Sequence, residues 1–227
     1  MKKELWVSKP DNLFIASLVT LVFSSLSLFL LRFLATGTLR YWFLMWNLLL
    51  SVMPLCFALL LDNNFKNNRW LSGKNLLFTI LWLSFLPNSF YIISDLIHLR
   101  STGEISVLFD AVLITSFVIC GLVFGMMSVY IIHKQLLNRL SPLRSNLLIS
   151  AVLLLSSFAI YLGRYLRWNS WDVALSPAGI IYDVSDRIIN PVANVQTFGI
   201  TLTFFIVLIS TYFFTFSAIN YLKEGKL

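Results

Sequence analysis

Residues 75–98, NLLFTILWLSFLPNSFYIISDLIH, decide the fold class of this chain. The stretch is long and apolar enough to cross the roughly 30 Å hydrocarbon core of a bilayer as one helix. It also contains a proline, an asparagine, an aspartate and a histidine, and such polar groups are costly next to lipid. A span with this composition indicates a helix that packs against other helices or lines a wet cavity.

The rest of the chain has the same apolar character. Of its 227 residues 58% are hydrophobic and 12% are charged, against about 25% charged in soluble domains. Because backbone groups in lipid must be paired internally, the apolar stretches are expected to be helices. The sequence therefore predicts an all-α polytopic membrane bundle, a single domain over 1–227, with six transmembrane helices at about 13–34, 41–61, 75–98, 106–133, 146–167 and 197–222.

The basic residues predict the orientation of these helices. Eleven of the 17 lysines and arginines lie on the side that holds both termini, and six lie on the other side. Because cytoplasmic segments are enriched in Lys and Arg, both termini are expected in the cytoplasm. This topology also accounts for the net charge of +7, so the charge does not indicate a nucleic-acid partner.

The longest connection, residues 168–196, contains a further helical pattern. Ser176 and Pro177 resemble an N-cap followed by a first-turn proline. Ile180, Ile181 and Ile188 then recur at helical spacing, with charged residues on the rest of the turn. The pattern predicts a short amphipathic helix on the outer face, which lies in the membrane interface or forms a lid over the spans.

Asn88, Tyr91, Asp95 and His98 fall in one stripe about 80° wide when the third span is drawn as an α-helix. Pro87, near the middle of this span, cannot donate a hydrogen bond to the preceding turn. A kink or break is therefore expected at 86–88. A break would line a polar cavity, whereas a kink would serve only helix packing.

The predicted topology brings several charged side chains to one outer layer. The fifth span ends in GRYLRWNSWD, residues 163–172, on the side where the third span ends and the fourth begins. A mixture of carboxylates and guanidiniums at one depth favours ion pairs, and the expected pairs are Asp95 or Asp110 with Arg164. The expected layer comprises Asp95, His98, Asp110, Arg164, Arg167 and Asp172.

The segments LPNSFYIISDLIHL and GRYLRWNSWD resemble the two signature stretches of the domain-of-unknown-function family 1361, which are bacterial multipass membrane proteins. The resemblance covers nearly the whole chain and implies a bacterial plasma-membrane location, but no activity. It marks as signature positions Pro87, Asn88, Tyr91, Asp95, His98, Arg164, Arg167, Asn169, Trp171 and Asp172.

The leading functional hypothesis is a site in the outer leaflet that binds or processes an anionic lipid or cell-envelope molecule. Arg164, Arg167, Asn169 and Trp171 would hold the anion, because arginine suits phosphate. Asp95 and His98 would supply catalytic proton chemistry, and together they are also the candidates for a metal site. No cofactor is strongly implied.

Two other functions stay open. In an accessory or structural membrane protein, the polar stripe and the charge pairs, Asp110 and Asp172 included, would only fix helix packing. In a small transporter they would line a substrate path, although the inner half of the spans is poor in polar residues. The expected partners are the lipid bilayer and a second copy or another membrane protein; the sequence does not decide whether the chain is an enzyme.

Overall fold

The computed structural model describes residues 12–65, 72–101 and 103–223, and within these ranges the chain forms helices and no strands. The helices are α1 (Asn12–Thr36), α2 (Trp42–Phe65), α3 (Gly73–Tyr91), η1 (Ile92–His98), α4 (Val107–Leu137), α5 (Pro142–Tyr165), α6 (Asp172–Leu175), α7 (Pro177–Ile189) and α8 (Val195–Lys223). Six of the helical stretches are long and apolar enough to cross a membrane, the third being α3 continued by η1. The predicted all-α membrane bundle with six spans is confirmed.

The chain divides into two compact units, Met1–Asn138 and Arg139–Leu227. Unit 1 contains α1 to α4 with η1, and unit 2 contains α5 to α8. The prediction that residues 1–227 form a single domain stays a prediction.

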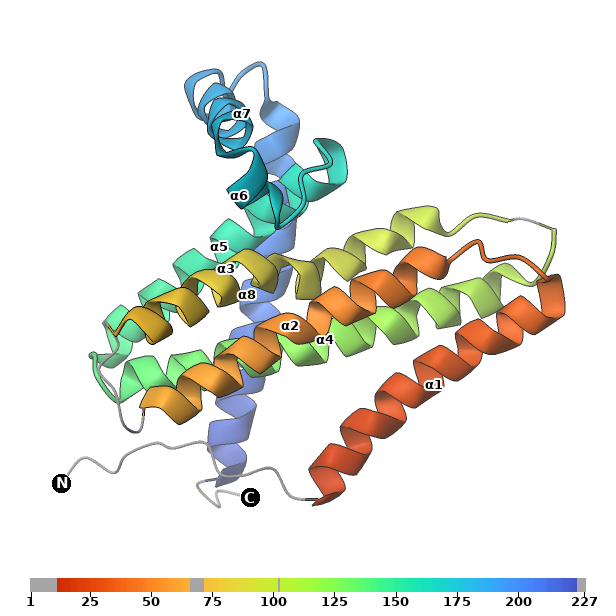
Figure 1. The fold of residues 1–227 in the computed structure, drawn as a ribbon, viewed down its shortest axis with the longest axis horizontal. Coiled ribbons are helices and arrows are strands. Elements are labelled where there is room, and N and C mark those ends of the chain that lie inside the picture. The colour runs from red at the N-terminus through yellow and green to blue at the C-terminus, as the bar shows by residue number, and fades with distance from the viewer. Residues whose placement is uncertain (1–11, 66–71, 102, 224–227) are drawn as a thin grey trace. The chain divides into compact units, whose positions relative to one another are not determined.

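The core of unit 1 consists of α2, α3 and α4, which lie side by side (Figure 1). Two glycines of α4 let α3 come close: a Cβ on Gly121 would lie 2.6 Å from the carbonyl oxygen of Ser89, and one on Gly125 would lie 2.9 Å from the Ser89 Cβ. Small residues four apart are the usual means by which membrane helices pack closely. The Ser89 hydroxyl donates to the Ser51 carbonyl of α2 at 2.7 Å, so this serine joins all three helices.

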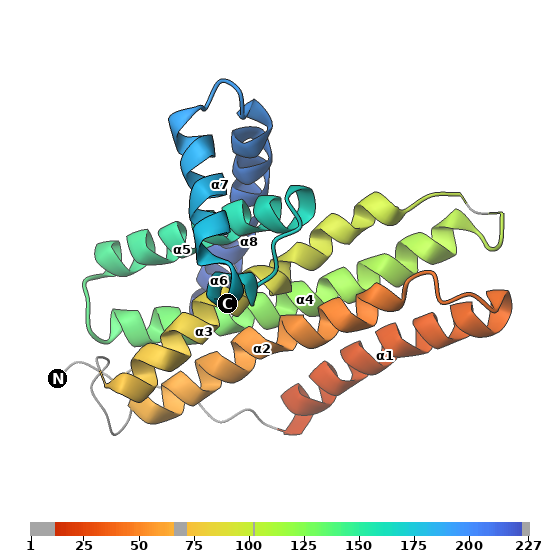
Figure 2. The ribbon, with the colours of Figure 1, turned by 45° about the horizontal axis from the view of Figure 1, so that its top comes forward.

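Helix α1 is attached to unit 1 differently. It meets α4 through its C-terminal half and diverges from the other helices toward its N-terminal end (Figures 1 and 2). The residues of α1 that are buried are both polar, Ser25 and Arg32. Polar contacts therefore fix α1, because apolar side chains gain little from leaving lipid for another helix.

The third span does not break where its proline predicts. Helix α3 stays α-helical through Pro87 as far as Tyr91 and then tightens into the 3-10 helix η1. Asn88 Nδ2 donates to the carbonyl oxygen of Phe85 at 3.0 Å, which helps to satisfy this segment of backbone. Of the two alternatives expected at 86–88, the break is wrong, whereas the kink stays a prediction; the change from α-helix to 3-10 helix comes at Ile92.

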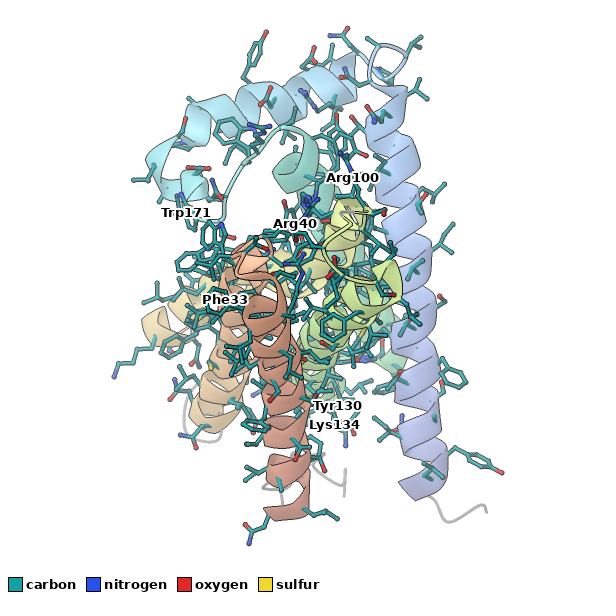
Figure 3. The ribbon with its side chains drawn as sticks, turned by 90° about the vertical axis from the view of Figure 1, so that its right-hand side faces the viewer. Phe33, Arg40, Arg100, Tyr130, Lys134 and Trp171 are labelled. Atoms are coloured by element: carbon teal, nitrogen blue, oxygen red, sulfur yellow. The ribbon has the colours of Figure 1, made fainter. Side chains whose placement is uncertain are left out.

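In unit 2 the long helices α5 and α8 pack together, and α6 and α7 lie in the connection between them. Helix α7 runs across the direction of α8 in Figure 3. Ile181, Tyr182, Ile188 and Ile189 of α7 are all at least 65% exposed. The predicted short amphipathic helix is thus present, with its apolar face uncovered.

Candidate functional site

The end of unit 1 where α1 ends and α4 begins holds a buried ion pair. Arg32 and Asp110 are each only 1% exposed, and Arg32 Nε donates to Asp110 Oδ1 at 2.8 Å. Other donor atoms of the same guanidinium bind Glu104 at 3.1 Å and the Thr38 hydroxyl at 3.1 Å. The Arg32 guanidinium lies 4.6 Å from the ring centroid of Tyr41, whose hydroxyl donates to Asp110 at 3.1 Å. We call these five residues the Arg32 cluster.

The Arg32 cluster has the features of a structural ion pair. Its guanidinium uses all three of its nitrogens, and both Asp110 oxygens accept hydrogen bonds. A buried charge that is paired and hydrogen-bonded in this way costs little to keep, whereas removing one partner strands the other. The cluster therefore connects α1, the residue that precedes α2 and the first turn of α4.

A second buried carboxylate, Asp95, lies in η1 and is also 1% exposed. Its Oδ2 accepts a hydrogen bond from Asn47 Nδ2 of α2 at 2.6 Å. Residues three apart eclipse each other in a 3-10 helix, so Asp95 and His98 share one face more closely than α-helical spacing predicts. The half-buried His98 ring lies 4.8 Å from the ring of Phe43, centroid to centroid.

Hydrogen bonds between helices continue along the interior of unit 1 to its opposite end. They join Asn47 to Asp95, Ser51 to Ser89, Trp82 to Ser128, and Asp62 to Gln135. Gln135 binds Asp62 at 2.6 Å, and His133, two positions earlier in the chain, is also buried. The sequence had indicated that this half of the spans is poor in polar residues, and that prediction is wrong for unit 1.

These hydrogen bonds favour helix packing over a transport path. Along α2, Ser51 and Asp62 are separated by about 16 Å of helix rise. The buried side chains of α2 in this interval are Pro54, Leu55, Ala58 and Leu61, all apolar. Isolated polar pairs in an apolar interior hold membrane helices in register.

In unit 2 the segment 166–172, which we call the Arg167 turn, connects α5 to α6. The backbone amides of Leu166 and Trp168 both donate to the carbonyl oxygen of Leu162, at 3.1 and 3.3 Å. Asp172 Oδ2 accepts from the Asn169 backbone amide at 2.7 Å and from Asn169 Nδ2 at 3.2 Å. The turn is therefore closed at both of its ends by hydrogen bonds.

Helix α7 holds the same turn from a second direction. Trp168 Nε1 donates to Asp183 Oδ2 at 2.7 Å. The Trp168 ring lies against Gly179, where a Cβ would come within 2.7 Å of it. Arg187 of α7 pairs with the same Asp183 at 3.3 Å. An indole between two α7 residues fixes the position of the turn relative to α7.

Arg167 itself is exposed and has a left-handed backbone, with φ of 62°. It is the one residue other than glycine with positive φ among the described residues. Glycine is the usual residue where a helix ends in this conformation, because a Cβ there costs about 1–2 kcal/mol. A strained, exposed cation in a turn that its neighbours hold rigid is an arrangement typical of functional sites.

The carboxylates in the described part of unit 2 are engaged by other groups. Asp172 binds Asn169, and Asp183 binds Trp168 and Arg187. Asp186 accepts from Asn190 at 2.8 Å and from Asn194 at 3.2 Å, and these hydrogen bonds lower the pKa of its carboxyl below the usual 3.8. The Arg167 guanidinium is thus left to face solvent or a ligand.

The remaining predicted site residues are located here by their positions within unit 1 or unit 2. Pro87 and Asn88 lie inside α3, and the half-buried Tyr91 is its last residue. Arg164 lies in the last turn of α5, half-buried, and Trp171 is 41% exposed beside α6. Within unit 1 the Asp110 carboxylate is paired with Arg32. The other expected pair, Asp95 with Arg164, would join the two units and stays a prediction.

A metal site at Asp95 and His98 would need a third ligand. Among the residues that the structure describes, no three histidine, cysteine, aspartate or glutamate side chains gather as a metal site would require. The chemistry of these two side chains toward a metal stays a prediction.

Sequence reasoning missed the partners more often than the charges. The sequence patterns do not single out Arg32, Tyr41 or Asn47 as site residues. One signal was available, since Arg32 lies two residues from the end of the first predicted span, where a charge needs a partner. The identity of that partner depends on which helices are neighbours.

The six apolar helices, the buried ion pair and the amphipathic α7 together define a multipass helical membrane protein in a lipid bilayer. A family model described as "Protein of unknown function (DUF1361)" matches residues 46–211. The chain belongs to this family, as the two quoted segments predict. No curated protein and no solved structure matches the chain.

Proposed function

We propose that this protein binds an anionic lipid, or another anionic amphiphile of the cell envelope, at the Arg167 turn. The observation that carries this proposal is the exposed Arg167, which keeps a left-handed backbone although glycine would fit there without strain. A guanidinium is well suited to a phosphate or carboxylate, which it can bind with two parallel hydrogen bonds. Asn169, Trp171 and the nearby Arg164 would complete the site.

The surroundings of the turn favour an amphiphile over a small soluble anion. The four exposed apolar residues of α7 offer a surface for acyl chains, and α7 runs across α8, as an interfacial helix would (Figure 3). Tryptophan is enriched at membrane interfaces, and Trp171 is partly exposed beside the turn. An anionic head group would then lie over Arg167 with its chains along α7.

The test is lipid retention by the full chain purified in detergent, measured by native mass spectrometry with phosphatidylglycerol. Arg167→Gly should retain phosphatidylglycerol at least about tenfold more weakly, because a charge-assisted contact is lost. Arg144→Gln, which removes an exposed charge from the first turn of α5, is the matched control and should bind as the wild type does. Equal retention by Arg167→Gly and the wild type would contradict the proposal.

Asp95 and His98 of unit 1 are the proposed residues for any proton chemistry, a role separate from anion binding at the Arg167 turn of unit 2. Their shared face on η1 supports a joint role, and Asn47 orients the carboxylate. If they act chemically, Asp95→Asn should fold normally and lose the cellular phenotype of the protein. Loss of the protein from the membrane instead would show that Asp95 serves helix packing.

We further propose that the membrane is the bacterial plasma membrane and that both termini are cytoplasmic, on the basis of the basic-residue distribution. Reporter fusions at Gly103 and Arg139 should then report outside and inside respectively. The reverse pattern would place the Arg167 turn in the cytoplasm and remove the envelope-facing ligand from the proposal.

A second candidate function, an accessory membrane protein whose polar groups only hold its helices, is supported by the Arg32 cluster. That cluster is satisfied internally and needs no ligand. This function predicts that variants of Arg167 leave both lipid retention and phenotype unchanged.

A further inference from the structure

Two arginines outside the Arg167 turn, Arg40 and Arg100, lie at the Arg32 end of unit 1 (Figure 3). The Thr38 hydroxyl donates to Glu104 at 3.4 Å, and the rings of Phe43 and His98 are 4.8 Å apart. These two contacts bring the turn between α1 and α2 alongside the segment between η1 and α4. In the chain, Arg40 lies between Thr38 and Phe43, and Arg100 lies between His98 and Glu104. Figure 3 shows both arginines at this end of unit 1.

Both side chains are exposed, while the carboxylates of the same end are bound elsewhere. Glu104 and Asp110 bind the Arg32 guanidinium, and Asp95 accepts from Asn47. The Arg40 guanidinium is 5.8 Å from the ring centroid of Tyr41, a contact that leaves its hydrogen-bond donors available. This rim therefore presents two guanidiniums to solvent above a buried end that is already paired.

The two sides of the predicted topology differ in whether their basic residues are lysines or arginines. On the side of the predicted topology that holds the termini, eight of the eleven basic residues are lysines. On the opposite side all six are arginines: Arg32, Arg40, Arg100, Arg164, Arg167 and Arg187. Charge alone would be served by either residue, but only the planar guanidinium fork binds phosphate through two hydrogen bonds.

The apolar residues beside the two arginines match a lipid. Leu39 and Trp42 flank Arg40 in the chain and are 57% and 61% exposed, and Ile97, near Arg100, is 57% exposed. Exposed tryptophan and aliphatic side chains next to cations are typical of the level where head groups meet acyl chains.

We propose that Arg40 and Arg100 form a phosphate-binding site, and that the phosphate is carried by the head group of an anionic phospholipid. The site is built wholly from unit 1 and does not depend on the Arg167 turn. Each guanidinium would donate to phosphate oxygens, while Trp42 and Ile97 would contact the acyl chains.

The experiment uses the full chain, delipidated in a nonionic detergent and titrated with phosphatidylglycerol under native mass spectrometry. The variant Arg40→Gln/Arg100→Gln should retain one phosphatidylglycerol fewer than the wild type, or bind it at least about tenfold more weakly. The control Lys74→Gln/Arg144→Gln removes two exposed charges elsewhere and should match the wild type. Arg167→Gly should leave this unit-1 site occupied, so failure here and failure at the Arg167 turn are distinguishable.

Two further arms sharpen the assignment. Arg40→Lys/Arg100→Lys keeps both charges and should bind several-fold more weakly, because the fork is lost. Excess inorganic phosphate should leave the lipid in place; if it displaces the lipid, the phosphate site stands and its ligand is free phosphate. Unchanged retention in the Gln or the Lys pair, or an equal loss in the Lys74/Arg144 control, would overturn the proposal.

Discussion

The Arg32 cluster of unit 1 and the Arg167 turn of unit 2 use the same side chain in opposite ways. Arg32 is 1% exposed, and two carboxylates and a threonine hydroxyl take up its donors. Arg167 is exposed, and the carboxylates around it in unit 2 are bound to other groups. In the first arrangement the guanidinium is paired within the fold, whereas in the second it is exposed and available to a ligand.

The backbones of the two arginines differ in the same sense. Arg32 continues a regular helix, but Arg167 has the left-handed conformation that costs a side chain about 1–2 kcal/mol. A residue whose only role is structural would gain from being glycine there. Arg32 therefore serves stability, whereas Arg167 is the residue that we propose binds a ligand.

The largest effect is expected for Arg32→Gln. The change leaves Asp110 buried without its cation, and breaking a buried pair in this way costs about 3–5 kcal/mol. The unfolding temperature in detergent and the amount of protein in the membrane should both fall sharply, while the exposed Arg144→Gln should change neither. A variant that unfolds at the wild-type temperature would show that the cluster does not hold α1.

A smaller loss is expected where α4 meets α3. Gly121→Ala would place a Cβ 2.6 Å from the Ser89 carbonyl, and Gly125→Ala would place one against the Phe90 ring. Overpacking of this kind costs about 1–3 kcal/mol. Gly199→Ala in α8 is the control, because nothing lies within 4 Å of its added Cβ. If all three variants melt alike, the close α3–α4 packing is not important for stability.

Trp168→Phe should loosen the Arg167 turn without unfolding unit 2. The smaller phenyl ring would lose part of the contact that the indole Cη2 makes with Gly179, and the hydrogen bond to Asp183 would be lost, at a cost of about 1 kcal/mol for the hydrogen bond. Faster hydrogen exchange in 177–189 is the expected readout, with Trp171→Phe as the control. Unchanged exchange would mean that the Trp168 indole does not position the turn.

The smallest effect concerns pH. Because the pKa of Asp186 is lower in the folded protein than its usual 3.8, the carboxylate stabilises α7 above that pH. The contribution is lost only as the pH falls through the lowered value. The end of α7 and residues 190–194 should therefore become mobile below pH 3.8 in the wild type, whereas in Asp186→Asn the same segment should show no such transition.

The spans could be predicted from sequence because twenty apolar residues in a row have few alternatives in a bilayer. The amphipathic α7 could be predicted because its apolar residues from Ile180 to Ile188 recur at helical spacing. Pro87 is a poor guide to where the helix geometry changes, because it affects only the backbone hydrogen bonds of its own turn. The 3-10 helix that sets the geometry of Asp95 and His98 begins only at Ile92.

The partners of the charged residues were harder to predict. Asp110 pairs with Arg32, 78 positions earlier, because α1 is a neighbour of α4, and no spacing in the sequence reports helix neighbours. The strain at Arg167 is likewise invisible in the letters GRYLRWNSWD, since it depends on where α5 ends. Composition determines the membrane class, whereas pairing and strain depend on tertiary packing.

The most direct test of the contrast is to measure stability and phosphatidylglycerol retention together in Arg167→Gly and Arg32→Gln. Arg167→Gly should have a free energy of unfolding up to about 1 kcal/mol higher than the wild type, because backbone strain is relieved, and should lose anionic lipid. Arg32→Gln should lose stability, and the part that stays folded should keep its lipid at the Arg167 turn. An Arg167→Gly protein that is less stable than the wild type, with lipid retention unchanged, would contradict the account.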